Sequence, residues 1–269
     1  MENAQWVPGE VDVRRPSVAR VYDYYLGGSH NFEADREMAR RVIEMSPNAV
    51  PVARANRAFL RRAVRFCMDA GIRQFLDIGS GIPTVGNVHD VAQQLDPSAR
   101  VVYVDIDPIA VAHSRAILEG NPNATVIQAD LRDPAAILAH PECVRLLDLD
   151  RPVAVLLVSV MHFVADSDDP AGIVGHLAGA VVPDSHLVFS QATLDGAPAV
   201  KVNSAKELYS RTDTQLTMRS REDIENMLAG WDLVEPGLTY LSWWRPESPD
   251  DVDPDAPRSV FLAAVGRKP

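Results

Sequence analysis

Two carboxylates in this chain stand where a parallel sheet would present them to a ligand. Asp77 lies at the end of an apolar run, two residues before the turn Gly79-Ser80-Gly81, and Asp105 ends a second apolar run further along the chain. Glycines in such a turn let the backbone approach a bound molecule closely. A strand, a glycine turn and a second strand that ends in an acid are typical of a βαβ unit that binds nucleosides.

The position of Asp77 separates two classes of nucleoside. A pyrophosphate is negatively charged, so a carboxylate in the same turn would repel it. S-adenosylmethionine has no phosphate and carries a positive amine and a positive sulfonium. The sequence therefore favours S-adenosylmethionine over NAD. The third glycine of a full Gly-x-Gly-x-Gly turn is also missing, since Pro83 takes its place. We expect Pro83 to lie in the first turn of the following helix.

Further polar residues follow the next predicted strands. Asp105 is expected to accept hydrogen bonds from a ribose diol, because its neighbour Asp107 suits the N-cap of a helix that begins at Pro108. After the third strand, Asp130 is expected to accept a hydrogen bond from an adenine amino group, and Leu131 to offer its backbone N–H. The predicted cofactor-binding residues of this region are Asp77, Gly79, Ser80, Gly81, Asp105, Ile106, Asp130, Leu131 and Ser159.

The fourth predicted strand leads into Ser159 and His162. Ligands of open parallel sheets lie beyond the carboxyl ends of the strands, so these residues should face the reacting methyl group. His162 is the candidate general base on titration grounds. A packed, structural histidine is an equally good interpretation. Methyl transfer is an in-line displacement that can run on proximity and orientation without a base.

Charge, residue spacing and the lengths of apolar runs argue against several other classes of function. The net charge of −11 argues against a nucleic-acid-binding surface over most of the molecule. Cys67, Cys143 and the histidines show no metal-type spacing, so no metal site is predicted. Ser80 does not lie in a Gly-x-Ser-x-Gly nucleophile elbow. No apolar run approaches about 18 residues, so no membrane segment is expected, and the predicted location is the cytoplasm.

The periodicity of apolar residues predicts an α/β fold. Strands that alternate with helices from residue 74 onward indicate a mostly parallel sheet with helices on both faces, and two final strands joined without a helix indicate an antiparallel pair. Helices ahead of residue 74 would form an N-terminal cap. The predicted strands are 74–78, 101–104, 125–128, 153–158, 186–191, 233–243 and 259–265, and the predicted helices are 17–26, 33–46, 52–70, 85–95, 108–119, 134–139, 171–181, 205–210 and 220–230.

With these motifs in place, the chain resembles class I S-adenosylmethionine-dependent methyltransferases. It looks closest to an actinobacterial S-adenosyl methyltransferase family formerly catalogued as DUF574. The residues that carry this resemblance are Arg15-Pro16-Ser17, Tyr22-Asp23-Tyr24-Tyr25-Leu26-Gly27-Gly28, Asn31-Phe32, Ala34-Asp35-Arg36, Ala55–Arg62, Phe75–Thr84 and Gly86-Asn87-Val88-His89.

The resemblance implies a Rossmann-like, seven-stranded sheet with the last strand antiparallel, and S-adenosylmethionine as cofactor. By motif position, Asp77, Gly79 and Gly81 correspond to the methionine end of the cofactor and Asp105 to its ribose. The residues after the third strand correspond to the adenine. The methyl acceptor is not implied.

One hypothesis concerns the N-terminal region, residues 1–73, ahead of a core at 74–269. A bend at Gly27-Gly28 would bring Tyr22, Tyr25, Gly28 and Asn31 toward the cofactor as a lid, where a tyrosine face stabilises a sulfonium. The function predicted is methyl transfer to an unidentified small molecule, without nucleic acid or membrane partners. The alternatives are a non-catalytic S-adenosylmethionine-binding or regulatory protein and an NAD-dependent oxidoreductase. An acceptor-sized cavity near His162 and Tyr209 would favour the enzyme.

Overall fold

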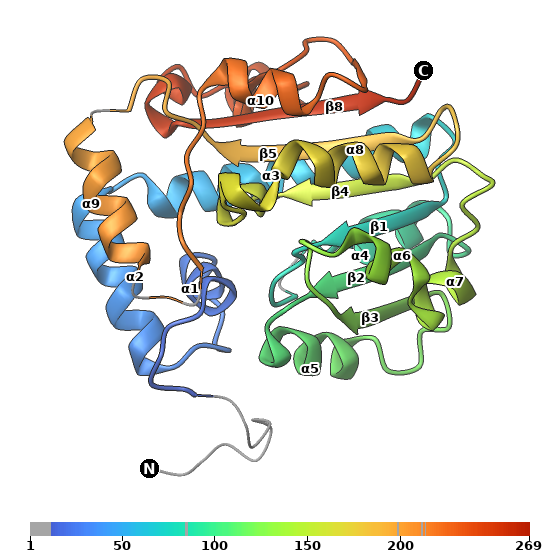
Figure 1. Ribbon diagram of the computed structural model, residues 1–269, viewed down its shortest axis with the longest axis horizontal. Helices are drawn as coiled ribbons and strands as arrows, with labels where there is room; N and C mark the ends of the chain where they lie inside the picture. The colour runs from blue at the N-terminus through green and yellow to red at the C-terminus, as the bar shows by residue number, and fades with distance from the viewer. Residues whose placement is uncertain (1–11, 84–85, 198, 211, 213) are drawn as a thin grey trace.

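An eight-stranded sheet runs through the centre of the molecule (Figure 1). The computed structural model describes residues 12–269 apart from 84–85, 198, 211 and 213. The strand order is β3-β2-β1-β4-β5-β8-β6, with β7 also paired to β8; β1 to β5 are parallel, and β8 is antiparallel to its neighbours. The strands are β1 (Gln74–Ile78), β2 (Arg100–Asp105), β3 (Ala124–Gln128), β4 (Ala154–Val158), β5 (His186–Ala192), β6 (Asp232–Leu233), β7 (Thr239–Tyr240) and β8 (Phe261–Arg267).

Helices cover both faces of this sheet, as the alternation of strands and helices in the sequence predicted. Alternate side chains of each strand point to opposite faces, so Phe75 packs with helices on one face and Leu76 with helices on the other. The first face is covered by α3 and α4, and the second by α7, α8 and α10. The helices are α1 (Val18–Tyr25), α2 (Glu33–Met45), α3 (Ala49–Asp69), α4 (Val88–Leu95), α5 (Pro108–Ile117), α6 (Pro134–Ala139), α7 (Pro141–Leu146), α8 (Pro170–Ala180), α9 (Ala199–Tyr209) and α10 (Arg221–Met227).

The antiparallel edge differs from the expectation. Residues 233–243 form two short strands, β6 and β7, rather than one, and this raises the strand count from seven to eight. Pro236 and Gly237 lie between them, and proline cannot donate to a ladder. Pro83 also differs, because α4 begins only at Val88 and Pro83 therefore lies outside the helix.

Helices α1, α2 and α9 lie together beside the carboxyl ends of the parallel strands (Figure 1). Their shared cluster contains Val21, Tyr25 and Met38, with Tyr209 of α9 packed against it. The third N-terminal helix, α3, also packs against the sheet, where Phe59 is part of the hydrophobic core. The division of the chain at residue 73 stays a prediction, since α3 packs on both the cap and the sheet.

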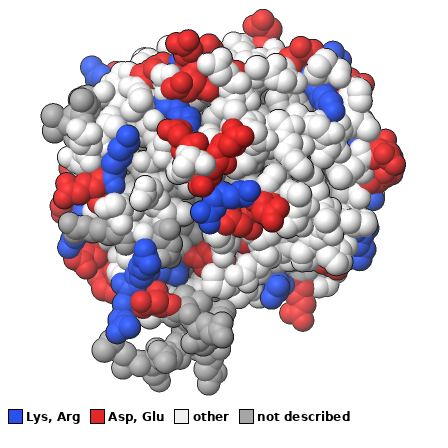
Figure 2. Space-filling model, viewed as in Figure 1, with Lys and Arg blue, Asp and Glu red and all other residues white. Residues whose placement is uncertain are grey.

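The described surface carries both signs of charge. On the face that Figure 2 shows, basic side chains lie scattered among acidic ones. Within the described residues, no helix is long and apolar enough to span a bilayer. The same residues contain no group of three or more His, Cys, Asp or Glu placed to hold a metal ion.

Candidate cofactor and acceptor site

A cavity of about 760 Å³ lies at the carboxyl ends of the parallel strands, beneath the cap. Drug-sized ligands occupy pockets of roughly 300–1,000 Å³. The lining comes from the ends of β1 to β5, the start of β8, and helices α1, α2, α3 and α9. The lining contains acidic residues from the ends of β1 and β2 and apolar residues from the cap, α9 and β8.

The glycine turn after β1 forms part of the lining. Gly79 has φ +74°, and a Cβ there would lie 2.3 Å from a Val160 methyl, so only glycine fits. The backbone N–H groups of Gly79 and Ser80 donate to the carbonyl of Val104, 2.8 and 3.1 Å away, which ties the turn to β2. The Ser80 hydroxyl is buried at the cavity with no hydrogen-bond partner among the described residues.

Asp105 and Asp107 have separate tasks at the end of β2. Asp107 caps α5, with Oδ1 accepting the N–H of Ile109 at 2.7 Å, as predicted from the sequence. Asp105 lines the cavity, and its carboxylate accepts the N–H of Gly81 at 2.7 Å and that of Asp107 at 2.9 Å. A carboxylate has about four lone-pair positions, so Asp105 retains capacity for a ribose hydroxyl.

Burial shifts the titration of both candidate carboxylates. Removal from water raises the pKa of Asp77 to about 7, although the nearby Arg57 guanidinium opposes the shift. Burial raises the pKa of Asp105 to about 6, against backbone N–H groups that favour its charged form. Ionising these two buried carboxyls is costly in the ligand-free protein. A ligand with a positive charge or with hydroxyl donors would stabilise their charged forms.

The residues after β3 lie at the cavity edge. Asp130 accepts a short hydrogen bond of 2.5 Å from Arg132, which holds the pKa of its carboxyl below the ordinary value. Leu131 is buried beside it, and Ile106 is half-exposed at the same edge. The structure therefore brings the residues predicted for adenine into the same cavity as Asp77 and Asp105.

A buried polar chain connects the fourth strand to the cap. Ser159 has φ +60°, a conformation that non-glycine residues rarely adopt, and its N–H donates to the Ser190 carbonyl and hydroxyl at 3.0 Å. The Ser190 hydroxyl donates to Asn56 at 2.6 Å, and the Asn56 amide donates to the Tyr22 hydroxyl at 3.0 Å. Sequence reasoning missed Asn56 and Ser190; the available signal was a polar residue on the apolar face of the α3 pattern.

His162 lines the cavity but is poorly suited to catalysis as a base. It is 4% exposed, and burial, assisted by the positive charge of Arg219, lowers its pKa to about 3. Catalytic bases work best with a pKa near the operating pH. The role of general base stays a prediction that this pKa argues against. The ring packs edge-on against Phe261, with centroids 5.5 Å apart.

The predicted lid residues divide into two groups. Tyr22 and Tyr25 line the cavity, but Gly28 and Asn31 do not. The Asn31 amide donates instead to Asp23 at 2.8 Å and to the Gly28 carbonyl at 2.9 Å. A Cβ on Gly28 would lie 1.9 Å from the Asp23 carboxylate, so Gly28 permits this turn. Gly28 and Asn31 thus shape the turn after α1, and their contact with the cofactor stays a prediction.

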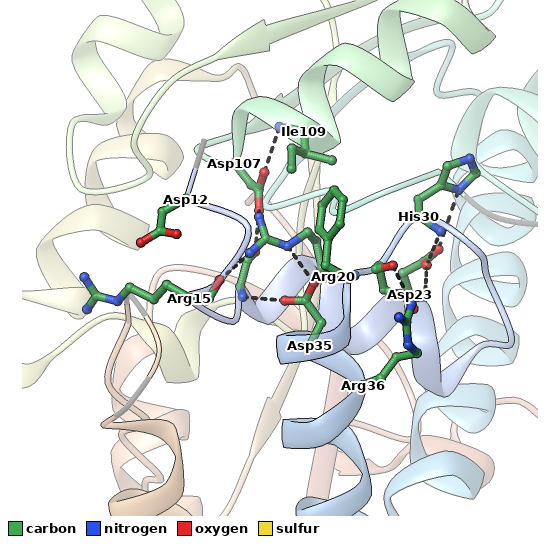
Figure 3. Close-up of polar contacts among 12 residues, drawn as sticks. Asp12, Arg15, Arg20, Asp23, His30, Asp35, Arg36, Asp107 and Ile109 are labelled. Carbon is green, nitrogen blue, oxygen red and sulfur yellow. Dashed lines mark hydrogen bonds and ion pairs between the residues drawn. The ribbon is translucent and has the colours of Figure 1, made fainter. Parts of the chain in front are cut away.

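The cap is fastened to the cofactor edge of the sheet by an ionic cluster (Figure 3). Buried Asp35 accepts the Nε–H of Arg20 at 2.9 Å and the backbone N–H of Ser17 at 2.9 Å. Arg20 also lies 3.7 Å from the Asp107 carboxylate, and the Ser17 hydroxyl donates to that carboxylate. The residue that caps α5 thus also holds α1 against the end of β2.

One group of lining residues, away from the ends of β1, β2 and β3 in the chain, is apolar and aromatic. Within this group, Phe163 and Tyr209 face each other with ring centroids 5.8 Å apart. We call this part of the cavity the apolar chamber, and its lining residues are Tyr25, Val42, Met45, Val52, Phe163, Ala205, Tyr209, Leu216, Met218 and Phe261. These side chains carry no charge, in contrast to those at the ends of β1, β2 and β3.

Comparisons with other proteins show the family to which this chain is similar. The S-adenosyl methyltransferase family model matches residues 4–269. A candidate methyltransferase from Thermobifida fusca is 42% identical, with a TM-score of 0.91 over 98% of this chain and 99% of that one. A DUF574 family protein from Streptomyces avermitilis is 38% identical, with a TM-score of 0.90 over 96% and 99%. A search of curated proteins gave no match. Because the family model covers nearly the whole length, the chain belongs to the S-adenosyl methyltransferase family.

Proposed function

We propose that this S-adenosylmethionine-dependent methyltransferase methylates an uncharged, largely apolar or aromatic small molecule held in the apolar chamber. The observation that carries the proposal is the continuity of one cavity from the acidic ends of β1 and β2 to the apolar chamber. A protein that only bound the cofactor would have no need for the second half.

The residues of the acidic half fit the cofactor. Buried Asp77 and Asp105 gain favourable partners from an ammonium group and a ribose diol. The unpartnered Ser80 hydroxyl is a further polar group available to the cofactor. Asp130, Leu131 and Ile106 would hold the adenine at the cavity edge. When bound, S-adenosylmethionine supplies an electrophilic methyl group on a positively charged sulfur.

The protein's own contribution is orientation and exclusion of water. Tyr22 and Tyr25 extend from the cap over the cavity, where an aromatic face attracts a cation by about 0.5–2 kcal/mol. The apolar chamber orients an acceptor by shape rather than by charge. Effective molarity from such positioning reduces a barrier by roughly 7–11 kcal/mol, so the displacement can run without a general base. S-adenosylhomocysteine leaves as the neutral thioether, and a proton on the acceptor atom is released to solvent after the transfer.

Transfer of label from methyl-labelled S-adenosylmethionine to a native cell extract tests this function. The label should enter a low-molecular-mass fraction that is extracted into organic solvent. Ala205, half-buried on α9, is a position at which a larger side chain would block the apolar chamber. The Ala205→Phe variant should fill the chamber and abolish transfer, while its affinity for S-adenosylhomocysteine stays within about twofold because the acidic half is untouched. Label in protein or nucleic acid would contradict the acceptor class, and no transfer with intact cofactor binding would favour a binding protein.

Cofactor binding should depend on pH and release protons. Asp77 and Asp105 have pKa values of about 7 and about 6, and only their charged forms pair with the ligand. Affinity for S-adenosylhomocysteine should therefore fall on the order of 30- to 100-fold from pH 8 to pH 5.5. Calorimetry at pH 6.5 in buffers of different ionisation enthalpy should show proton release. Affinity independent of pH over this range would mean that neither carboxylate meets the ligand.

A further inference from the structure

Arg57 is an unusual residue of the acidic half. It comes from α3, lines the cavity and is only 9% exposed. Its Nε is buried without a hydrogen-bond partner, and the described residues provide no ion pair to its guanidinium. A buried charge without a partner is costly, and proteins keep such groups mainly where a ligand completes them.

The surroundings of Arg57 exclude a simpler structural role as an ion-pair partner. Asp77 is near enough for the guanidinium to lower the pKa of its carboxyl, but no hydrogen bond joins the two. The Tyr22 ring lies 5.8 Å from the guanidinium carbon, at the outer range of a cation–π contact. By comparison, the other three arginines that line this cavity have polar partners: Arg20 pairs with Asp35, Arg132 pairs with Asp130, and Arg15 donates to the Thr212 carbonyl at 3.0 Å.

Asp77 and Arg57 together match one end of the cofactor. The ammonium and carboxylate of an α-amino acid are attached to the same carbon atom, so their receptor needs an acid and a base side by side. Asp77 suits the ammonium group, and Arg57 is a buried cation whose guanidinium has no ion pair or hydrogen bond with the described residues. A guanidinium presents a planar fork of N–H donors that suits a carboxylate.

We propose that Arg57 binds the carboxylate of the amino-acid end of S-adenosylmethionine, opposite Asp77. This inference rests on the proposed function, because it assigns a further contact in the same site. Sequence reasoning did not single out Arg57, since arginines are frequent along α3 and the pattern does not tell which one is buried. With this assignment, α1 and α3 both contact the ligand: α1 covers it, and α3 binds its charged end through Arg57.

Two ligands that differ only in the carboxylate test the proposal. They are S-adenosylhomocysteine and its decarboxylated analogue, S-adenosyl-3-thiopropylamine, which keeps the ammonium group. The unaltered protein should bind the first about 10- to 100-fold more tightly, the usual range for a hydrogen-bonded charged group. In Arg57→Met this preference should fall to within about twofold, whereas Arg54→Met, which removes an exposed arginine of the same helix, should retain it.

The stability of the ligand-free variant separates binding from structural support. If Arg57 serves the ligand, Arg57→Met should melt at the same temperature as the unaltered protein or higher, since it removes an unpaired buried charge. Equal losses of affinity for both ligands, or a lower melting temperature with an unchanged preference, would overturn the proposal. Failure of the unaltered protein to bind S-adenosylhomocysteine would instead refute the proposed function.

Discussion

Replacement of Asp77 by asparagine is expected to weaken S-adenosylhomocysteine binding at least about a hundredfold at pH 8 and to stabilise the ligand-free protein. Loss of one partner of a buried, hydrogen-bonded charge pair costs 2–5 kcal/mol or more, and about 2.8 kcal/mol corresponds to a hundredfold change. The amide keeps the shape of the carboxyl but removes the charge that attracts the ammonium group. Calorimetry measures the affinity, and urea denaturation the stability.

The stability gain follows from the raised pKa of Asp77. The folded protein holds this proton with a pKa of about 7, against an ordinary value of 3.8. Stability from the protonated group is therefore fully present below about pH 4 and is lost as the pH rises through about 7. At pH 8 the asparagine variant avoids this loss and should gain as much as about 4 kcal/mol. The gain should shrink as the pH approaches 4.

Asp96→Asn provides the matched control for this experiment. Asp96 lies at the opposite end of the sheet, where hydrogen bonds from Ser98 and Arg73 hold the pKa of its carboxyl below the ordinary value. Its replacement should leave cofactor affinity unchanged and should not stabilise the protein. A destabilised Asp77→Asn protein that still binds S-adenosylhomocysteine normally would show that the carboxylate serves the fold and not the ligand.

Local signals account for the parts of the structure that the sequence predicted well. β1 was predicted as 74–78 and is observed at those residues, because an apolar run with Gly71 before it and Gly79 after it is bounded on both sides. Asp107 followed by Pro108 specifies a helix start through one carboxylate and one fixed φ. Such signals act within a few residues and need no knowledge of the rest of the chain.

The sequence is least informative where distant residues decide the surroundings of a side chain. A bend at Gly27-Gly28 was expected to carry Asn31 toward the ligand, and the sequence did not reveal that its amide donates to Asp23 at 2.8 Å. His162 titrates near neutrality in isolation, and only its tertiary surroundings lower the pKa. The burial of Arg57 depends on how α3 packs between the sheet and the cap. No local pattern reports which of several similar side chains becomes buried.

Replacement of Asp35 by alanine should loosen the contact between the cap and the sheet. It should lower both the free energy of unfolding and the affinity for the cofactor. Asp35 is fully buried and accepts three hydrogen bonds, from the backbone of Ser17 and Phe32 and from the side chain of Arg20. Its removal leaves Arg20, only 3% exposed, without its hydrogen-bonded carboxylate, although the guanidinium still donates to the Arg15 carbonyl. Breaking a buried pair from one side costs about 3–5 kcal/mol. Urea denaturation should report this loss.

The same change should reach the ligand through Asp107, which Arg20 approaches to 3.7 Å at the end of β2. Amide hydrogen exchange should accelerate in α1, and S-adenosylhomocysteine affinity should fall by at least about tenfold, since Tyr22 and Tyr25 line the cavity from that helix. Glu33→Ala, on the exposed side of α2, should leave both measurements near those of the unaltered protein.

A double variant decides whether the ion pair itself causes these effects. If the cost comes from the stranded charge of Arg20, then Asp35→Ala combined with Arg20→Met should be more stable than Asp35→Ala alone. Additive losses in the double variant would mean that Asp35 acts mainly through the backbone of Ser17 and Phe32. In that case the hydrogen bonds of Asp35 to the backbone of Ser17 and Phe32 stabilise the cap. The contact between Arg20 and Asp107 then contributes little to its stability.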